Sequence, residues 1–172
     1  MKKKIIFGIS IILVIVVIFG VSFYVIKEYN YKSSALDKVS VTMNYDGFAN
    51  KEEYKEIISG FYVSQDISEK YKNAIKINLS VENNSDETVE LALNDLENEH
   101  FYIYESFIRL EPWMPIAANG QENTEMYILT TLSEEDLEVL KNQQFSFTVY
   151  DRDTDDWENF VSKDIDCNVT VN

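Results

Sequence analysis

INLSVENNSDETVELAL, residues 77–93, sets the fold class expected for this chain. Apolar side chains occupy every second position on both sides of a polar segment: Ile77, Leu79, Val81, Val89, Leu91 and Leu93. Alternation with a period of two is typical of a strand that buries one face and exposes the other. The polar segment, residues 83–87, is rich in residues that favour turns. The stretch therefore predicts a β-hairpin or a strand-to-strand corner, with Leu79 in a core and Asn78 in solvent.

The same alternation continues along the chain and makes the prediction all-β. Further strands are expected at residues 39–45, 61–67, 101–106, 126–131, 145–150 and 165–171. Two short helices are expected at residues 51–58 and 134–141, the second opened by a capping-box sequence at Ser133. Short strands separated by turn residues favour an antiparallel immunoglobulin-like β-sandwich. The predicted sandwich, with its one or two short helices, is a monomeric domain over residues 39–172.

The N-terminus has a different character. Residues 5–26 contain no charged side chain, and about 20 apolar residues in a helix span the hydrocarbon core of a bilayer. A cleaved signal peptide is one alternative, because three lysines precede the run and small residues lie near Ser22. The apolar run continues past Ser22, which favours a single N-terminal transmembrane helix that is retained as an anchor.

Charges beside the apolar run set the expected topology. Three lysines precede it, whereas Lys27 and Lys32 follow it. The balance predicts a single-pass protein of the cell membrane with its N-terminus in the cytoplasm and its C-terminal domain extracellular. The expected parts are a cytoplasmic tail at residues 1–4, a membrane anchor at 5–26, a stalk at 27–38 and an extracytoplasmic domain at 39–172.

The chain beyond Lys4 is strongly acidic. It holds 12 basic and 30 acidic residues, a net charge of −18. A field of this sign repels nucleic acids and anionic lipid head groups, so neither is an expected partner. Cys167 is the only cysteine, which excludes a disulfide within the chain. Its place on the apolar side of an alternating strand predicts a buried free thiol.

Three segments carry a resemblance to a known class of domain: residues 75–93, 116–130 and 145–153. They resemble the immunoglobulin-like extracytoplasmic domains of Gram-positive cell-envelope proteins and lipoproteins. In those domains a strand that ends in an Asn-rich turn is followed by a corner of small residues and glycine, here residues 117–121. The resemblance implies a non-catalytic accessory or binding domain and carries over no functional residue. The chain departs from the lipoproteins because no cysteine follows its apolar run.

Few residues suit catalysis or a cofactor. His100 is the only histidine, and no nucleophile motif lies near it in the sequence, so we expect a surface loop residue and not a catalytic base. A second histidine for a zinc site of the usual kind is missing, as are phosphate-binding loops of the GxGxxG or Walker type. The sequence predicts a protein that is not an enzyme and has no catalytic, cofactor-binding or metal-binding residues.

Two segments admit a binding role. Trp113 lies in a segment bounded by two prolines. It could be an exposed platform on which a ligand stacks, but we favour a buried position at one end of the predicted core. Residues 151–156, DRDTDD, resemble the first half of a calcium loop. The EF-hand pattern fails at its sixth and twelfth positions, which hold Asp156 and Ser162. A solvated acidic hairpin turn is therefore predicted for residues 151–156.

These observations favour a membrane-tethered accessory or protein-interaction module of the cell envelope, without catalysis. Its expected partners are the membrane, through residues 5–26, and an envelope protein that the sequence does not identify. The alternative is a glycan- or calcium-binding envelope module, which an exposed Trp113 or an ordered acidic loop would favour.

Overall fold

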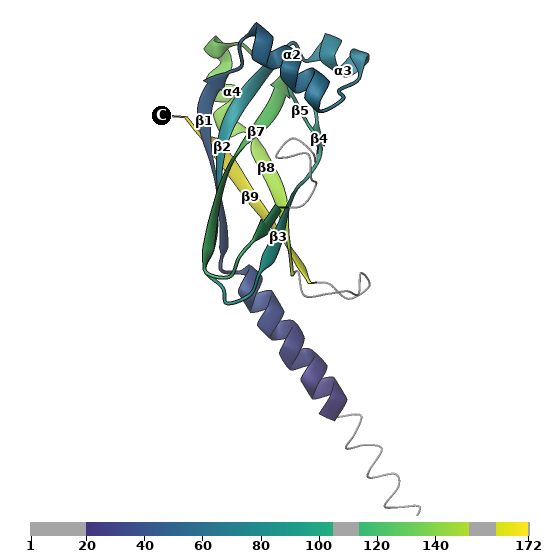
Figure 1. Ribbon diagram of the computed structural model, residues 1–172, viewed down its shortest axis with the longest axis vertical. Coiled ribbons are helices and arrows are strands. Elements are labelled where there is room, and N and C mark those ends of the chain that lie inside the picture. Colours follow the sequence, from purple (N-terminus) through teal and green to yellow (C-terminus); the bar gives the residue numbers. More distant parts are fainter. Residues whose placement is uncertain (1–19, 105–113, 152–160, 172) are drawn as a thin grey trace, which may run out of the picture.

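The computed structural model of the chain describes residues 20–104, 114–151 and 161–171. Its strands are β1 (Val39–Phe48), β2 (Asn73–Asn83), β3 (Val89–Leu93), β4 (Leu96–Glu97), β5 (Phe101–Ile103), β6 (Met114–Ile116), β7 (Gly120–Thr130), β8 (Gln144–Asp151) and β9 (Ser162–Thr170). They form one nine-stranded sheet in the order β4-β5-β7-β2-β1-β9-β8-β3-β6. Neighbours are antiparallel except β1 and β9, which run parallel. The sheet is therefore mixed, and it curls into a half-barrel (Figure 1).

The prediction of an antiparallel immunoglobulin-like β-sandwich is wrong. The parallel pairing of β1 with β9 joins the strands into one curled sheet whose concave side holds the core. Alternation along a strand shows that one face is buried, but it does not show which strand lies beside it. Two packed sheets and one curled sheet therefore leave the same pattern in the sequence.

Residues 77–93 form a strand-to-strand corner, the second of the two predicted alternatives. β2 lies between β1 and β7, whereas β3 lies between β6 and β8, so the two strands do not pair with each other. The predicted register is confirmed, because Leu79 is 1% exposed and Asn78 is exposed. The corner carries the chain from one half of the curled sheet to the other.

A buried asparagine holds this corner together. The Asn83 side chain is fully buried, and its amide Nδ2 donates to the backbone carbonyls of Glu87 at 2.8 Å and Ala117 at 3.0 Å. Its Oδ1 accepts from the Ser85 N–H at 3.0 Å and the Ser85 hydroxyl at 2.7 Å. At Gly120 a Cβ would lie 2.8 Å from the Ala117 carbonyl oxygen, so only glycine fits there. The Asn-rich turn and the glycine corner are thus bonded to each other.

We expect Asn83→Ala to lower the free energy of unfolding by about 2–4 kcal/mol, because several buried polar groups lose their partner at once. Asn84→Ala is the matched control, since the Asn84 side chain is exposed, and should cost less than about 0.5 kcal/mol. Urea denaturation followed by circular dichroism measures both. Similar midpoints for the two variants would show that the Asn83 bonds do not fix the corner.

Most predicted elements appear close to their expected positions. The helices are α2 (Lys51–Gly60), α3 (Gln65–Lys70) and α4 (Leu137–Asn142), the last preceded by the 3₁₀ turn Glu134–Asp136. The capping box at Ser133 is present, with Asp136 accepting from its N–H and hydroxyl. The strand predicted at residues 61–67 is wrong, since this segment leaves α2 and enters α3. β6 was not predicted, because it is three residues long and contains Pro115. Proline is tolerated only in an edge strand, and β6 lies at the edge of the sheet.

A helix over residues 20–36 precedes β1 and extends from the end of the sheet opposite α2 and α3 (Figure 1). Residues 1–19, most of the predicted anchor, lie outside the described residues. Within the described ranges no helix is long and apolar enough to cross a membrane. This finding contradicts the predicted transmembrane helix at residues 5–26 and the single-pass localisation that depended on it. The helix described here continues without a break through Lys27, Glu28 and Lys32, which are charged.

The last turns of this helix, within the predicted stalk at residues 27–38, make contacts with the rest of the protein. Tyr31 donates its hydroxyl hydrogen to Asp86 at 2.8 Å, and the Lys32 ammonium lies 2.8 Å from the Asp151 carboxylate. Leu36 is 1% exposed and belongs to the core. The helix and the sheet are therefore joined by polar and apolar contacts together. Large apolar side chains are exposed nearer the N-terminal end of this helix: Val21, Phe23, Tyr24, Val25, Ile26 and Tyr29.

Candidate functional site

The helix α2 lies at the far end of the sheet, and the sequence around it explains why a helix forms there (Figure 1). Asn50 caps its start: the side-chain oxygen accepts from the N–H groups of Glu52 at 2.9 Å and Glu53 at 3.1 Å. The Glu53 carboxylate accepts from the Asn50 N–H at 2.7 Å, which completes a capping box. The helix ends at Gly60, after which Phe61 leaves the helical path.

A turn of about 100° per residue distributes the side chains of α2 over three faces. Tyr54 and Ile57 face the body of the protein, where Ile57 is 6% exposed. Lys51 and Lys55 share one flank. Glu53 and Glu56 share the other. The two flanks of this one helix therefore carry opposite charge.

The acidic flank borders a groove on the outer face of the sheet. Its lining residues come from α2, the turn after it, β2 and β7: Glu53, Glu56, Ile57, Phe61, Lys76, Glu125 and Tyr127. Lys76 and Tyr127 are cross-strand neighbours, and Glu125 is two residues before Tyr127 on the same face. The groove has a volume of about 430 Å³, within the range of about 300–1,000 Å³ typical of ligand sites. Helix and strands together thus form a concave surface.

Two aromatic rings form the apolar part of this groove. The centroids of Phe61 and Tyr127 lie 5.9 Å apart, with ring planes inclined at 56°. The Tyr127 hydroxyl donates to Glu125 at 3.2 Å. Partial burial, and then the nearby Glu125 carboxylate, raise the pKa of Tyr127. This phenol is therefore a neutral hydroxyl at physiological pH, and its ring is held in place by contacts at both ends.

The rim of the groove has an excess of negative charge. The Lys76 ammonium pairs with Glu53 at 3.1 Å. The Asn50 N–H, followed by Lys76, lowers the pKa of the Glu53 carboxyl, which stays ionised. Glu56 and Glu125 add two carboxylates with no second lysine in the lining. An aromatic floor with a carboxylate rim suits a cationic side chain, above all an arginine that stacks on a ring while it binds carboxylates.

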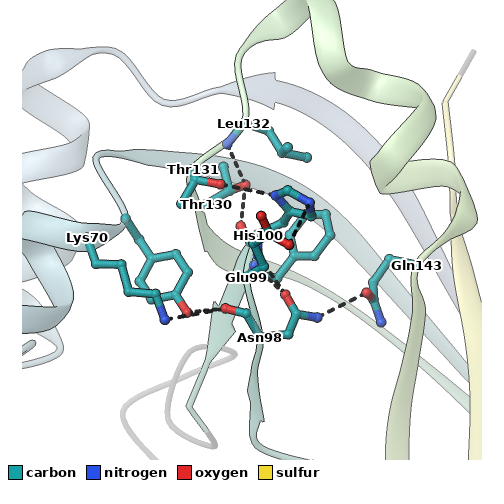
Figure 2. A network of polar contacts seen from close by, with 10 residues as sticks. Lys70, Asn98, Glu99, His100, Thr130, Thr131, Leu132 and Gln143 are labelled. Carbon is teal, nitrogen blue, oxygen red and sulfur yellow. Dashed lines mark hydrogen bonds and ion pairs between the residues drawn. The ribbon is translucent and has the colours of Figure 1, made fainter.

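His100, the one candidate catalytic base, belongs to a structural network between β4 and β5 (Figure 2). Asn98 closes the loop, since its Oδ1 accepts from the N–H groups of His100 and Phe101, both at 2.8 Å. The His100 carbonyl accepts from the Thr130 hydroxyl at 2.8 Å and the Thr131 N–H at 3.0 Å. These bonds involve backbone groups, so the network holds a loop against β7.

Among the described residues, the polar groups that contact the His100 imidazole are a hydroxyl and an exposed carboxylate. Its Nδ1 lies 3.3 Å from the Thr131 hydroxyl and its Nε2 lies 3.9 Å from the Glu99 carboxylate. A catalytic triad needs a carboxylate that orients the ring from a protected position. Glu99 is 87% exposed, and the His100 side chain is 39% exposed. The structure places His100 in a partly exposed surface loop, as the sequence indicated.

The two binding segments predicted from the sequence fall mainly outside the described residues. Trp113 and residues 152–156 lie outside the described residues. Asp151 is described, and its carboxylate is directed to Lys32 at the base of the N-terminal helix. Among the described ranges no group of three carboxylate, histidine or cysteine side chains is placed to hold a metal ion. Cys167 is half-buried and free, and burial raises the pKa of its thiol to about 11.

A second hollow on the outer face bears on the glycan alternative. It has a volume of about 380 Å³ and is lined by Asn44, Asn78, Leu79, Ser80, Asn123, Thr124 and Glu125. Amides and hydroxyls bind sugar hydroxyls, but none of these residues supplies an aromatic face for stacking. The groove beside α2, which has two rings, is the better binding surface.

The sequence alone does not predict this groove. A helix with lysines and glutamates on separate flanks was visible in KEEYKEI at residues 51–57. Its neighbours were not, because Lys76 and Tyr127 are 51 positions apart in the chain and meet only through the pairing of β2 with β7. A charged flank of a helix by itself indicates only a solvated surface, so the charge pattern of residues 51–57 did not predict a binding groove.

Comparison with known proteins gives little support for any function. No known protein family and no curated protein matches the chain. A FixG-related protein from Vibrio parahaemolyticus aligns with 77% of this chain and 96% of its own, at 10% identity and a TM-score of 0.33. A β-glucosidase from Kluyveromyces marxianus, in complex with glucose, aligns with 76% of this chain, which spans 14% of the enzyme, at 11% identity and a TM-score of 0.19. Likenesses this weak carry no argument, and the resemblance to Gram-positive envelope domains stays a prediction.

Proposed function

We propose that this protein is a non-catalytic interaction module that holds a basic segment of a partner protein in the groove formed by α2, β2 and β7. The observation that carries the proposal is the joint presence of Phe61 and Tyr127 as an aromatic floor and of three glutamates at the rim. Aromatic and arginine side chains dominate the energetics of protein interfaces, and complementary charge sets specificity.

The groove also suits an extended segment for a geometric reason. It runs between a helix and the face of two paired strands. A side chain of the partner can therefore enter while its backbone passes outside. The net charge of −15 attracts a basic segment from a distance and repels acidic competitors.

Selection from a library of random displayed peptides tests this function. The full chain is the target, and the Glu56→Lys variant, which reverses charge at the rim, removes binders that do not use the groove. We expect enriched peptides that bind the wild-type chain and lose about fivefold or more in affinity for Glu56→Lys, the order expected for one exposed charge pair. Enriched peptides that bind both proteins equally, or no enrichment, would contradict the proposal.

A further inference from the structure

The opposite flank of α2 forms a hollow of its own, with positive charge. Lys51 and Lys55 are one helical turn apart and so lie on the same flank, and Lys72, the residue before β2, lines the same hollow. The hollow has a volume of about 430 Å³. Three lysines therefore meet around one concavity in a chain whose overall charge is −15.

Lys51, Lys55 and Lys72 belong to the lysines of the described ranges that do not pair with a carboxylate, a group that also includes Lys27 and Lys38. Five lysines there lie within 4.0 Å of a carboxylate: Lys32, Lys70, Lys76, Lys141 and Lys163. Within the described ranges no carboxylate is that close to Lys51, Lys55 or Lys72. Ammonium groups that share a hollow repel each other, and a bound anion removes that repulsion. Three such lysines around one hollow of so acidic a chain indicate a site for an anion from outside.

The helix start does not supply the anion site. The N–H groups of Glu52 and Glu53 are already bonded to the Asn50 side chain. The lysine side chains, with the positive end of the helix dipole behind them, provide the charge. Ala49 and Tyr54 add an apolar wall. Tyr54 is fixed in place, because its hydroxyl donates to the carbonyls of Tyr71 at 2.6 Å and Ser68 at 3.1 Å.

We propose that the hollow of Lys51, Lys55 and Lys72 binds a phosphate monoester group carried by a small organic molecule. Lysine ammonium groups are point-charge donors suited to phosphate oxygens. The volume accommodates an organic part beside the phosphate, against Ala49 and Tyr54. A polyanion is disfavoured, because the acidic surface beyond the hollow repels every further negative charge. This site is separate from the groove for the basic segment and does not depend on it.

Phenyl phosphate is the probe, added to the full chain and followed by isothermal titration calorimetry and by amide chemical shifts. We expect saturable binding with shifts centred on residues 49–55 and 72–73. The Lys51→Gln/Lys72→Gln double variant should bind about tenfold more weakly, since each exposed charge pair contributes up to about 1 kcal/mol. Lys141→Gln, which removes a lysine paired with Glu138 on α4, should bind within about twofold of wild type.

Three results would overturn the proposal. If Lys141→Gln weakened phenyl phosphate binding as much as the double variant, the ligand would be attracted to lysines in general and not to one site. Equal affinity for inorganic phosphate and phenyl phosphate would show that no organic part is recognised. Shifts that are absent at millimolar phenyl phosphate, or that lie elsewhere, would show that the hollow is not the binding site.

Discussion

Leu79→Asp should leave most of the protein unfolded at room temperature, whereas Asn78→Asp should fold normally. Leu79 is 1% exposed in the core of the curled sheet, and its neighbour Asn78 is exposed on the outer face. Burial of a carboxylate without a partner costs several kcal/mol, and the lost apolar contacts add about 2–5 kcal/mol. The sum is comparable to the entire stability of an ordinary domain, about 5–15 kcal/mol.

The comparison is sharp because both variants introduce the same side chain one position apart. Circular dichroism and urea denaturation of the two proteins provide the measurement. A one-residue shift in the pairing of β2 with β1 and β7 would exchange the two results. Two variants of equal stability would therefore contradict the observed register.

Lys32→Met should destabilise the protein by about 3–5 kcal/mol. The Lys32 ammonium lies 2.8 Å from the Asp151 carboxylate, and these side chains are 18% and 5% exposed. Removal of the lysine leaves a carboxylate in a site with little access to water. Methionine keeps most of the apolar stem, so the effect reports the lost charge.

The matched control is the double variant Lys32→Met/Asp151→Asn, which removes both charges. Most of the lost stability should return, because the Asp151 charge is then no longer held in a site with little access to water. Lys163→Met tests an exposed pair, Lys163 with Asp37 at 2.7 Å, and should cost less than about 1 kcal/mol. Equal effects of Lys32→Met and Lys163→Met on the unfolding midpoint would show that the helix over residues 20–36 is not held by a buried ion pair.

The strands were predictable to the extent that burial alternates along them. Residues 77–93 gave their register correctly because Leu79 and its companions repeat every second position. The pairing was not predictable, since the parallel contact of β1 with β9 joins residues more than 120 positions apart. Parallel and antiparallel neighbours bury the same side chains, so a sandwich and a curled sheet look alike in the sequence.

Strand propensity gave a wrong prediction where the end of α2 determined the path of the backbone. Phe61, Tyr62 and Val63 favour strands by propensity, yet the backbone N–H groups of all three bond back to carbonyls of α2. Phe61 stacks near Tyr127 and contributes to the groove. The candidate site was missed because its two rings come from segments that the sequence does not connect. The sequence predicts Asn83 as part of a turn, whereas in the structure its side chain is fully buried and its hydrogen bond to Ala117 joins two corners.

Fluorescence anisotropy of a labelled oligo-arginine peptide tests the central claim, that the groove of α2, β2 and β7 binds a basic segment. Any basic peptide is attracted to a chain of net charge −15, so the comparison is between two charge reversals. Glu56 lies at the rim of the groove. Glu82 lies on the same outer face of β2, six residues and about 20 Å from Lys76 in the groove lining. We predict that Glu56→Lys weakens binding about fivefold or more relative to Glu82→Lys. Equal weakening by the two variants would contradict the claim, because only the overall charge would then matter.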